Sequence, residues 1–176
     1  SSIQNEKERL KSSFLKVIKY LAYINFPVYL LIVISSKEIL HIVYGPAYAE
    51  SYPVLSFLAF AYCLAALSNP AGSLQIATGR TDIGFKWTIL RVLITPPVII
   101  AGSLINIEAV AAFYAMLSLL FIIPLWFIQL KPMAKITLTE YLKQFYKPFL
   151  FFLAATLFIY IAGSKAELTG SILANA

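Results

Sequence analysis

Runs of apolar residues separated by short polar segments make up most of the chain. Five of these runs approach the length of about 20 residues that a helix needs to cross a bilayer. They cover about residues 14–34, 54–77, 85–104, 109–128 and 146–162. A soluble domain of this size has no core large enough to bury so much apolar surface. The pattern therefore predicts an all-α integral membrane protein, a multi-span helical bundle of about five transmembrane helices.

The segments outside these spans are polar or amphipathic. Residues 1–13 form a polar cytoplasmic segment, and residues 14–128 hold the first four spans. Residues 129–145 form a basic connector whose apolar spacing suits an interfacial helix, and residues 146–162 form the fifth span. We expect residues 163–176 to be a periplasmic tail leading to a further helix, and we expect the chain to continue upstream of Ser1.

Basic residues are distributed unequally between the two sides of the predicted membrane. Twelve Lys and Arg residues fall on the side of residue 1 and only two, Lys37 and Lys165, on the other. The positive-inside rule places the first side in the cytoplasm and Ala176 outside. The net charge of +6 is therefore explained by membrane orientation, and we expect no nucleic-acid partner.

Few residues are available for metal or covalent chemistry. The chain contains one cysteine, Cys63, and one histidine, His41, so no internal disulfide or metal-spaced Cys/His cluster can form. We expect no catalytic residue, no metal site and no cofactor.

One stretch carries a family resemblance. Leu67 to Trp87 reads LSNPAGSLQIATGRTDIGFKW, and Ile107 to Ala111 reads IEAVA at the start of the fourth span. These pieces resemble the C-terminal part of the bacterial polysaccharide flippases of the multidrug/oligosaccharidyl-lipid/polysaccharide exporter superfamily. The similar branch holds the colanic-acid, teichuronic-acid and O-antigen exporters.

The resemblance implies a two-lobed transporter in the bacterial inner (plasma) membrane, of which these spans form part of the C-terminal lobe. It implies that a polyprenyl-diphosphate-linked oligosaccharide moves from the cytoplasmic to the periplasmic leaflet by alternating access. Implied partners are that substrate, membrane lipids, and a polysaccharide polymerase with its assembly proteins. Flipping makes and breaks no bond, so the implied protein is not an enzyme.

Four polar residues are candidates for substrate binding. Arg91 lies within the third span, where a charge is costly and usually faces a cavity. Either it binds the diphosphate, or its long side chain extends to lipid phosphates at the membrane surface. The other candidates are Lys86, Asn69 and Gln75, of which Gln75 is alternatively a hydrogen-bonding contact between helices.

Prolines are candidate hinges. Pro70 follows Asn69 in the second span, and Pro96 and Pro97 lie in the third. Proline removes a backbone donor and disfavours helix at the preceding residue, so each site is either a hinge or a static kink.

Two other functions stay open. A cation-coupled exporter of small molecules needs an acidic residue inside the spans, and Glu108 lies at a helix end. A membrane glycan polymerase or ligase needs a large outer loop rich in charged residues. The loop over residues 35–53 has only Lys37, Glu38, His41 and Glu50.

Overall fold

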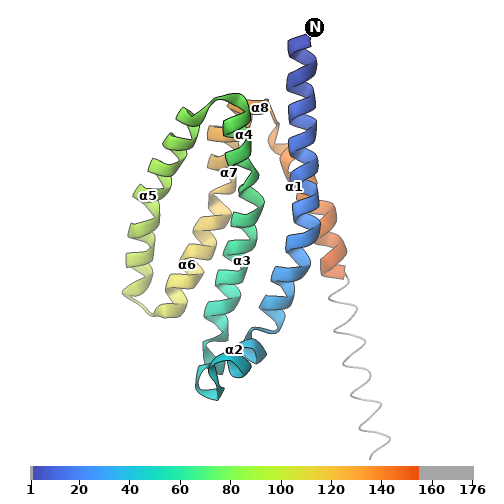
Figure 1. The fold of residues 1–176 in the computed structure, drawn as a ribbon. Helices are drawn as coiled ribbons and strands as arrows, with labels where there is room; N and C mark the ends of the chain where they lie inside the picture. Colours follow the sequence, from blue (N-terminus) through green and yellow to red (C-terminus); the bar gives the residue numbers. More distant parts are fainter. Residues whose placement is uncertain (1, 155–176) are drawn as a thin grey trace, which may run out of the picture.

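The computed structural model describes residues 2–154, with side-chain surroundings from residue 5 onward. The chain folds into helices that run up and down the molecule (Figure 1). In order they are α1 (Ser2–Ile34), α2 (Ser36–Tyr44), η1 (Pro46–Ser51), α3 (Tyr52–Ser68), α4 (Pro70–Thr78), α5 (Thr81–Ser103), α6 (Ile107–Leu120), α7 (Ile122–Leu125), η2 (Trp126–Leu130) and α8 (Lys131–Ala134). Residues 138–154 form one more helix, and residues 2–154 contain no strand.

Four helical runs in the described residues are long and apolar enough to cross a membrane. They are Asn5–Ile34, Pro46–Thr78, Thr81–Ser103 and Ile107–Ala134. The predicted all-α membrane bundle is therefore confirmed. Of the predicted fifth span, residues 146–154 continue the helix that starts at residue 138, and residues 155–162 lie outside the described residues, as does the tail 163–176.

Two of the predicted polar segments lie on helices. Residues 2–13 form the first turns of α1. Residues 129–145 contain the end of η2, α8, a break at residues 135–137, and the start of the next helix. In Figure 1 the start of α1, the α4–α5 turn and α8 lie at one end of the bundle, and α2 and the α5–α6 turn lie at the other. The predicted orientation places the first of these ends in the cytoplasm.

The α4–α5 turn is defined by glycine. Gly79 has φ +65°, a left-handed conformation that costs glycine little. Arg80 N–H donates to the Gln75 carbonyl at 3.0 Å, and Gly79 N–H donates to the Ile76 carbonyl at 3.2 Å, so the helix ends in a Schellman motif. Arg80 then pairs with Asp82 in the first turn of α5 at 2.9 Å.

The prolines leave the helices nearly continuous. Asn69 keeps helical angles (φ −55°, ψ −38°) between α3 and α4. Its N–H donates to Ala66 at 3.4 Å, and Gly72 N–H donates to the Asn69 carbonyl at 3.1 Å. Pro96 and Pro97 lie inside a single helix, α5, which is visibly bowed in Figure 1. Whether any of these prolines acts as a hinge stays a prediction.

A hydrophobic core cluster lies between α1, α4, the α7–α8 run and the helix over residues 138–154. Ile18, Leu74 and Tyr141 are almost completely buried there. Thr137 and Glu140 cap the last helix reciprocally: Glu140 N–H donates to Thr137 Oγ1 at 3.2 Å, and Thr137 N–H donates to Glu140 Oε2 at 2.8 Å. Lys11 of α1 pairs with Glu140 Oε1 at 2.7 Å, which joins the two helices.

Candidate functional site

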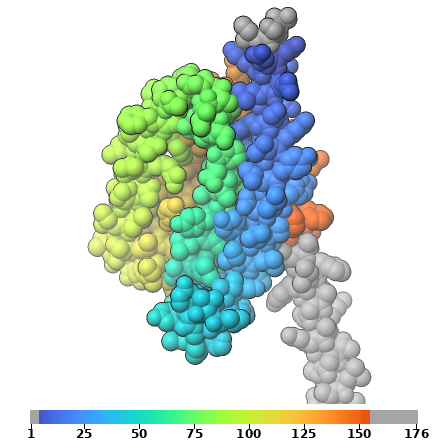
Figure 2. Space-filling model, viewed as in Figure 1, coloured from blue at the N-terminus to red at the C-terminus, as the bar shows by residue number. Residues whose placement is uncertain are grey.

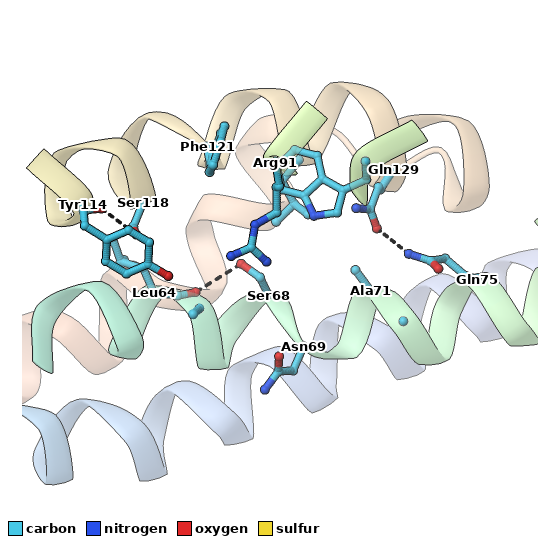
Figure 3. Close-up of a pocket in the computed structure, with 14 residues that line it drawn as sticks. Leu64, Ser68, Asn69, Ala71, Gln75, Arg91, Tyr114, Ser118, Phe121 and Gln129 are labelled. Carbon is cyan, nitrogen blue, oxygen red and sulfur yellow. Dashed lines mark hydrogen bonds between the residues drawn. The ribbon is translucent and has the colours of Figure 1, made fainter. Parts of the chain in front are cut away.

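A polar cavity of about 220 Å³ opens between α3–α4, α5 and the α6–η2 run. The helix α5 is bowed (Figure 1), and the space-filling view shows a hollow between α5 and α3–α4 (Figure 2). Fourteen residues line the cavity (Figure 3): Leu64, Ala65, Ser68, Asn69, Ala71, Gly72, Gln75, Trp87, Arg91, Tyr114, Ser118, Phe121, Leu125 and Gln129. Hydroxyl, amide and aromatic groups thus meet inside a bundle whose other surfaces are largely apolar.

Arg91 is the charged member of this lining. It lies ten residues after the start of α5 at Thr81, about 15 Å along the helix at 1.5 Å per residue, so it is close to the middle of this 23-residue span. Figure 3 shows its guanidinium pointing from α5 toward α3, close to Ser68. Within residues 2–154, the guanidinium has no hydrogen bond or ion pair with another side chain. This position favours the cavity interpretation of Arg91 over extension to the membrane surface.

Two amides close one end of the cavity. Gln75 Nε2 of α4 donates to Gln129 Oε1 of η2 at 2.9 Å. Gln129 is only 1% exposed. Gly84 of α5 lies against the Gln75 amide so closely that a Cβ at this position would overlap it. A Cβ at position 84 would therefore force the end of the Gln75 side chain to move.

Two serine hydroxyls line the cavity. Ser68 Oγ donates to the Leu64 carbonyl at 3.1 Å, and Ser118 Oγ donates to the Tyr114 carbonyl at 2.8 Å. The Ser68 side chain also hydrogen-bonds with the Tyr141 hydroxyl, so Ser118 is the serine whose oxygen keeps acceptor capacity toward a ligand. Trp87 and Phe121 pack edge to face beside them, with ring centroids 5.4 Å apart.

The structure places three of the four predicted substrate-binding residues in the cavity lining. Asn69, Gln75 and Arg91 line the cavity together, and Lys86 of α5 does not line it. Asn69 and Arg91 are exposed, as Lys86 is, so the cavity is open to its surroundings. A substrate role for all four stays a prediction.

The sequence analysis did not single out the other polar and aromatic residues of the lining, which are Ser68, Trp87, Tyr114, Ser118, Phe121 and Gln129. Gln129 directly follows the predicted fourth span and was assigned to the connector, so the sequence pattern gave no signal that its amide would be buried. Pro96 and Pro97 lie outside the cavity lining.

A second, more apolar groove lies on the opposite side of α3–α4. It has a volume of about 590 Å³ and runs between α1 and α4, lined by Phe14, Leu74 and Pro70 among others. Asn69 borders both spaces, so the α3–α4 junction separates a polar cavity from an apolar groove. Residues 2–154 contain no group of three His, Cys, Asp or Glu side chains placed to hold a metal ion.

Comparison with known proteins shows similarity to polysaccharide biosynthesis proteins. Residues 1–53 match the family described as Polysaccharide biosynthesis protein. The chain is 29% identical over 184 residues to an uncharacterized membrane protein in the cps region of Klebsiella pneumoniae, covering 98% of this chain and 36% of that protein. It is 32% identical over 150 residues to the teichuronic acid biosynthesis protein TuaB of Bacillus subtilis, covering 82% of this chain and 30% of TuaB.

The chain is a homologue of polysaccharide biosynthesis membrane proteins. A third relative, the lipopolysaccharide biosynthesis protein WzxC of Escherichia coli, is 27% identical over 164 residues, covering 93% of this chain and 33% of WzxC. The family resemblance drawn from the sequence is thereby confirmed. The chain spans about a third of the length of the curated relatives it matches. No solved structure matches it significantly.

Proposed function

We propose that this chain forms part of a flippase that moves polyprenyl-diphosphate-linked oligosaccharide units across the bacterial inner membrane by alternating access. The observation that carries the proposal is Arg91, a cation near the middle of a span, turned into a polar cavity without an acidic partner in the described residues. The names of the relatives support a role in polysaccharide biosynthesis.

The physical requirements of flipping agree with this site. A sugar-diphosphate head group crosses hydrocarbon only if its polar groups stay solvated or bonded, because each unpaired group costs several kcal/mol there. A cavity lined by a guanidinium, amides and hydroxyls replaces water for part of such a head group. The prenyl tail needs only lipid or an apolar surface.

The cavity lining favours transport over the two other candidates. None of its fourteen residues is Asp, Glu, His or Cys, so it holds no acid–base pair for a polymerase or ligase and no carboxylate for cation coupling. Polymerase and assembly partners remain part of the proposal for the whole protein.

The test uses the full-length gene in its host. Its deletion should cause lipid-linked oligosaccharide to accumulate in the cytoplasmic leaflet, and the wild-type gene should reverse this. Because charge-assisted hydrogen bonds contribute about 1.5–3 kcal/mol, Arg91→Ala should lower export about tenfold or more at unchanged membrane abundance. Lys19→Ala, which removes an exposed charge of α1 outside the cavity, serves as the matched control and should export normally.

The outcomes separate the candidates. Unchanged sidedness in a strain without a second flippase overturns the proposal and favours small-molecule export. Unpolymerised repeat units outside the cell favour the polymerase. A Lys86→Ala variant as defective as Arg91→Ala would show that the substrate path runs along the outer face of α5 and not through this cavity.

A further inference from the structure

One face of the fourth membrane-spanning run is apolar along its length and uncovered within the described residues. Its large side chains are spaced three or four residues apart, so they form one row along the helix. They are Met116, Leu120, Ile123 and Phe127, each of which is more than half exposed. The row covers about 16 Å at 1.5 Å per residue, close to the roughly 15 Å of one leaflet of the hydrocarbon core. It therefore has the length of an acyl chain in one leaflet.

A lysine ends this apolar row. The Lys131 ammonium lies 5.3 Å from the centroid of the Phe127 ring and 5.5 Å from that of the Trp126 ring. Ammonium groups are attracted to the faces of aromatic rings, so the two rings restrict where the long Lys131 side chain lies. Trp126 is itself fixed, because its Nε1–H donates to the Ile136 carbonyl at 2.8 Å. A cation is thus held at the end of the row, at the α8 end of the bundle (Figure 1).

A second lysine follows at the end of α8 in an unusual conformation. Lys135 has φ +49° and ψ +34°, the left-handed region in which glycine usually follows a helix. Its N–H donates to the Lys131 carbonyl at 3.0 Å, which closes the last turn of α8. Lysine at this position costs free energy that glycine would not, so the Lys135 side chain is a candidate for function.

The two lysines leave positive charge beside the apolar row. Both are exposed, and neither forms an ion pair within residues 5–154. Glu140, which lies five residues after Lys135, is already paired with Lys11 at 2.7 Å. An anion at the membrane surface complements this charge, and the phosphate of an anionic phospholipid is such a group.

We propose that this face binds an anionic phospholipid from the leaflet at the α8 end, which is the cytoplasmic leaflet in the predicted orientation. Its phosphate lies between Lys131 and Lys135, and one acyl chain lies along the row from Phe127 to Met116. The row belongs to a run long and apolar enough to cross the membrane, so a single lipid meets both the lysines and the apolar surface. The proposal does not depend on what the whole protein transports.

The test titrates the purified full-length protein with lipids and counts the bound molecules by native mass spectrometry. The probes are phosphatidylglycerol and phosphatidylcholine with identical acyl chains. Each lysine near an anionic lipid surface contributes a factor of about five in affinity, so phosphatidylglycerol should bind about tenfold or more tightly. Lys131→Gln should lower this preference about fivefold, and the double change with Lys135→Gln should abolish it. Lys143→Gln removes an exposed lysine of the following helix and should leave the preference unchanged, as the matched control.

A variant in the apolar row separates the acyl-chain contact from the head-group contact. Ile123→Ala removes apolar contact area and leaves both lysines in place. It should weaken the binding of both lipids to a similar extent and keep the preference for phosphatidylglycerol.

Four results overturn the proposal. Equal binding of the two lipids to the wild-type protein removes the head-group contact, and this result needs no variant to fold. A preference for phosphatidylglycerol that survives the double lysine change places the bound lipid elsewhere on the protein. Displacement by glycerol phosphate at the same concentration as by phosphatidylglycerol assigns the lysines to a soluble phosphate. Absence of any bound lipid shows that another helix of the whole protein covers this face.

Discussion

The two sides of the α3–α4 pair differ in chemistry and in packing. On one side, Leu74 packs with Ile18 and Tyr141 in a core cluster that leaves these side chains at most 2% exposed. On the other side, Ser68 and its polar neighbours border a cavity. The same two helices thus stabilise the bundle with one face and offer polar groups with the other.

This difference shows where stability and function lie. Lipid tails are as apolar as leucine, so helices in a membrane associate through close packing, as in the core cluster. Polar groups around an open space add little to such packing and are costly in lipid. Residues that break the local sequence pattern, such as a charge within an apolar helix, are expected at functional sites. Arg91 is such a residue.

Truncation of the core cluster should have the largest effect on stability. Leu74 is 2% exposed, and Leu74→Ala should lower the free energy of unfolding by about 2–5 kcal/mol through lost contacts and a cavity. The matched control is Ile76→Ala on the same helix, because Ile76 is 79% exposed and should change stability little. Thermal denaturation of the purified full-length protein measures both. Equal effects would contradict the assignment of the core to this face.

Removal of the amide partner across the cavity should have a smaller effect. Gln129→Leu leaves the half-buried Gln75 donor without its acceptor, which should cost about 1–3 kcal/mol. Replacing both glutamines by leucine should cost less than the single change, since no unpaired group remains. If the double variant is less stable than Gln129→Leu, the prediction is wrong. The Gln75 side chain would then stabilise the bundle by contacts other than its hydrogen bond with Gln129.

A methyl group at position 84 should break the same contact sterically. In a helix, Gly→Ala normally gains about 0.8–1 kcal/mol. Gly72→Ala should show this gain, because nothing lies within 4 Å of its Cβ position. Gly84→Ala should not show this gain in stability, because the new Cβ displaces the Gln75 amide from Gln129. The lost hydrogen bond is worth about 0.5–1.5 kcal/mol, which offsets the gain. Equal melting temperatures of the two variants would refute the close contact.

The smallest effect is expected at the link between α1 and the last described helix. Hydrogen bonds from Lys11 and Thr137 lower the pKa of Glu140 from 4.5 to about 2. The folded state therefore favours the ionised carboxylate, and this contribution is complete above pH 4.5 and lost as the pH falls toward 2. Glu140→Gln should lower stability at pH 7 by less than about 1 kcal/mol, because the pair is partly exposed. At pH 2 the variant and the wild type should have equal stability, and a difference that persists there would contradict the ionic origin.

Much of the fold was predictable from the sequence, and much of the site was not. The apolar runs predicted the four spans that the structure describes within residues 2–154. Arg91 was found because a charge inside an apolar run is conspicuous. Lys86 was also named as a candidate, although it lies five residues before Arg91 and therefore on another face of α5, outside the cavity lining.

The sequence by itself determined that the chain forms helices of membrane-spanning length and the order in which they follow one another. The physical reason is that hydrocarbon leaves each backbone group only its own helix as a partner, so an apolar run becomes a helix whatever surrounds it. The tertiary structure alone decided that Gln75 meets Gln129, 54 residues away, and that Lys11 meets Glu140. Those contacts depend on the rotation and curvature of each helix, which side-chain packing against neighbouring helices sets and no local pattern encodes.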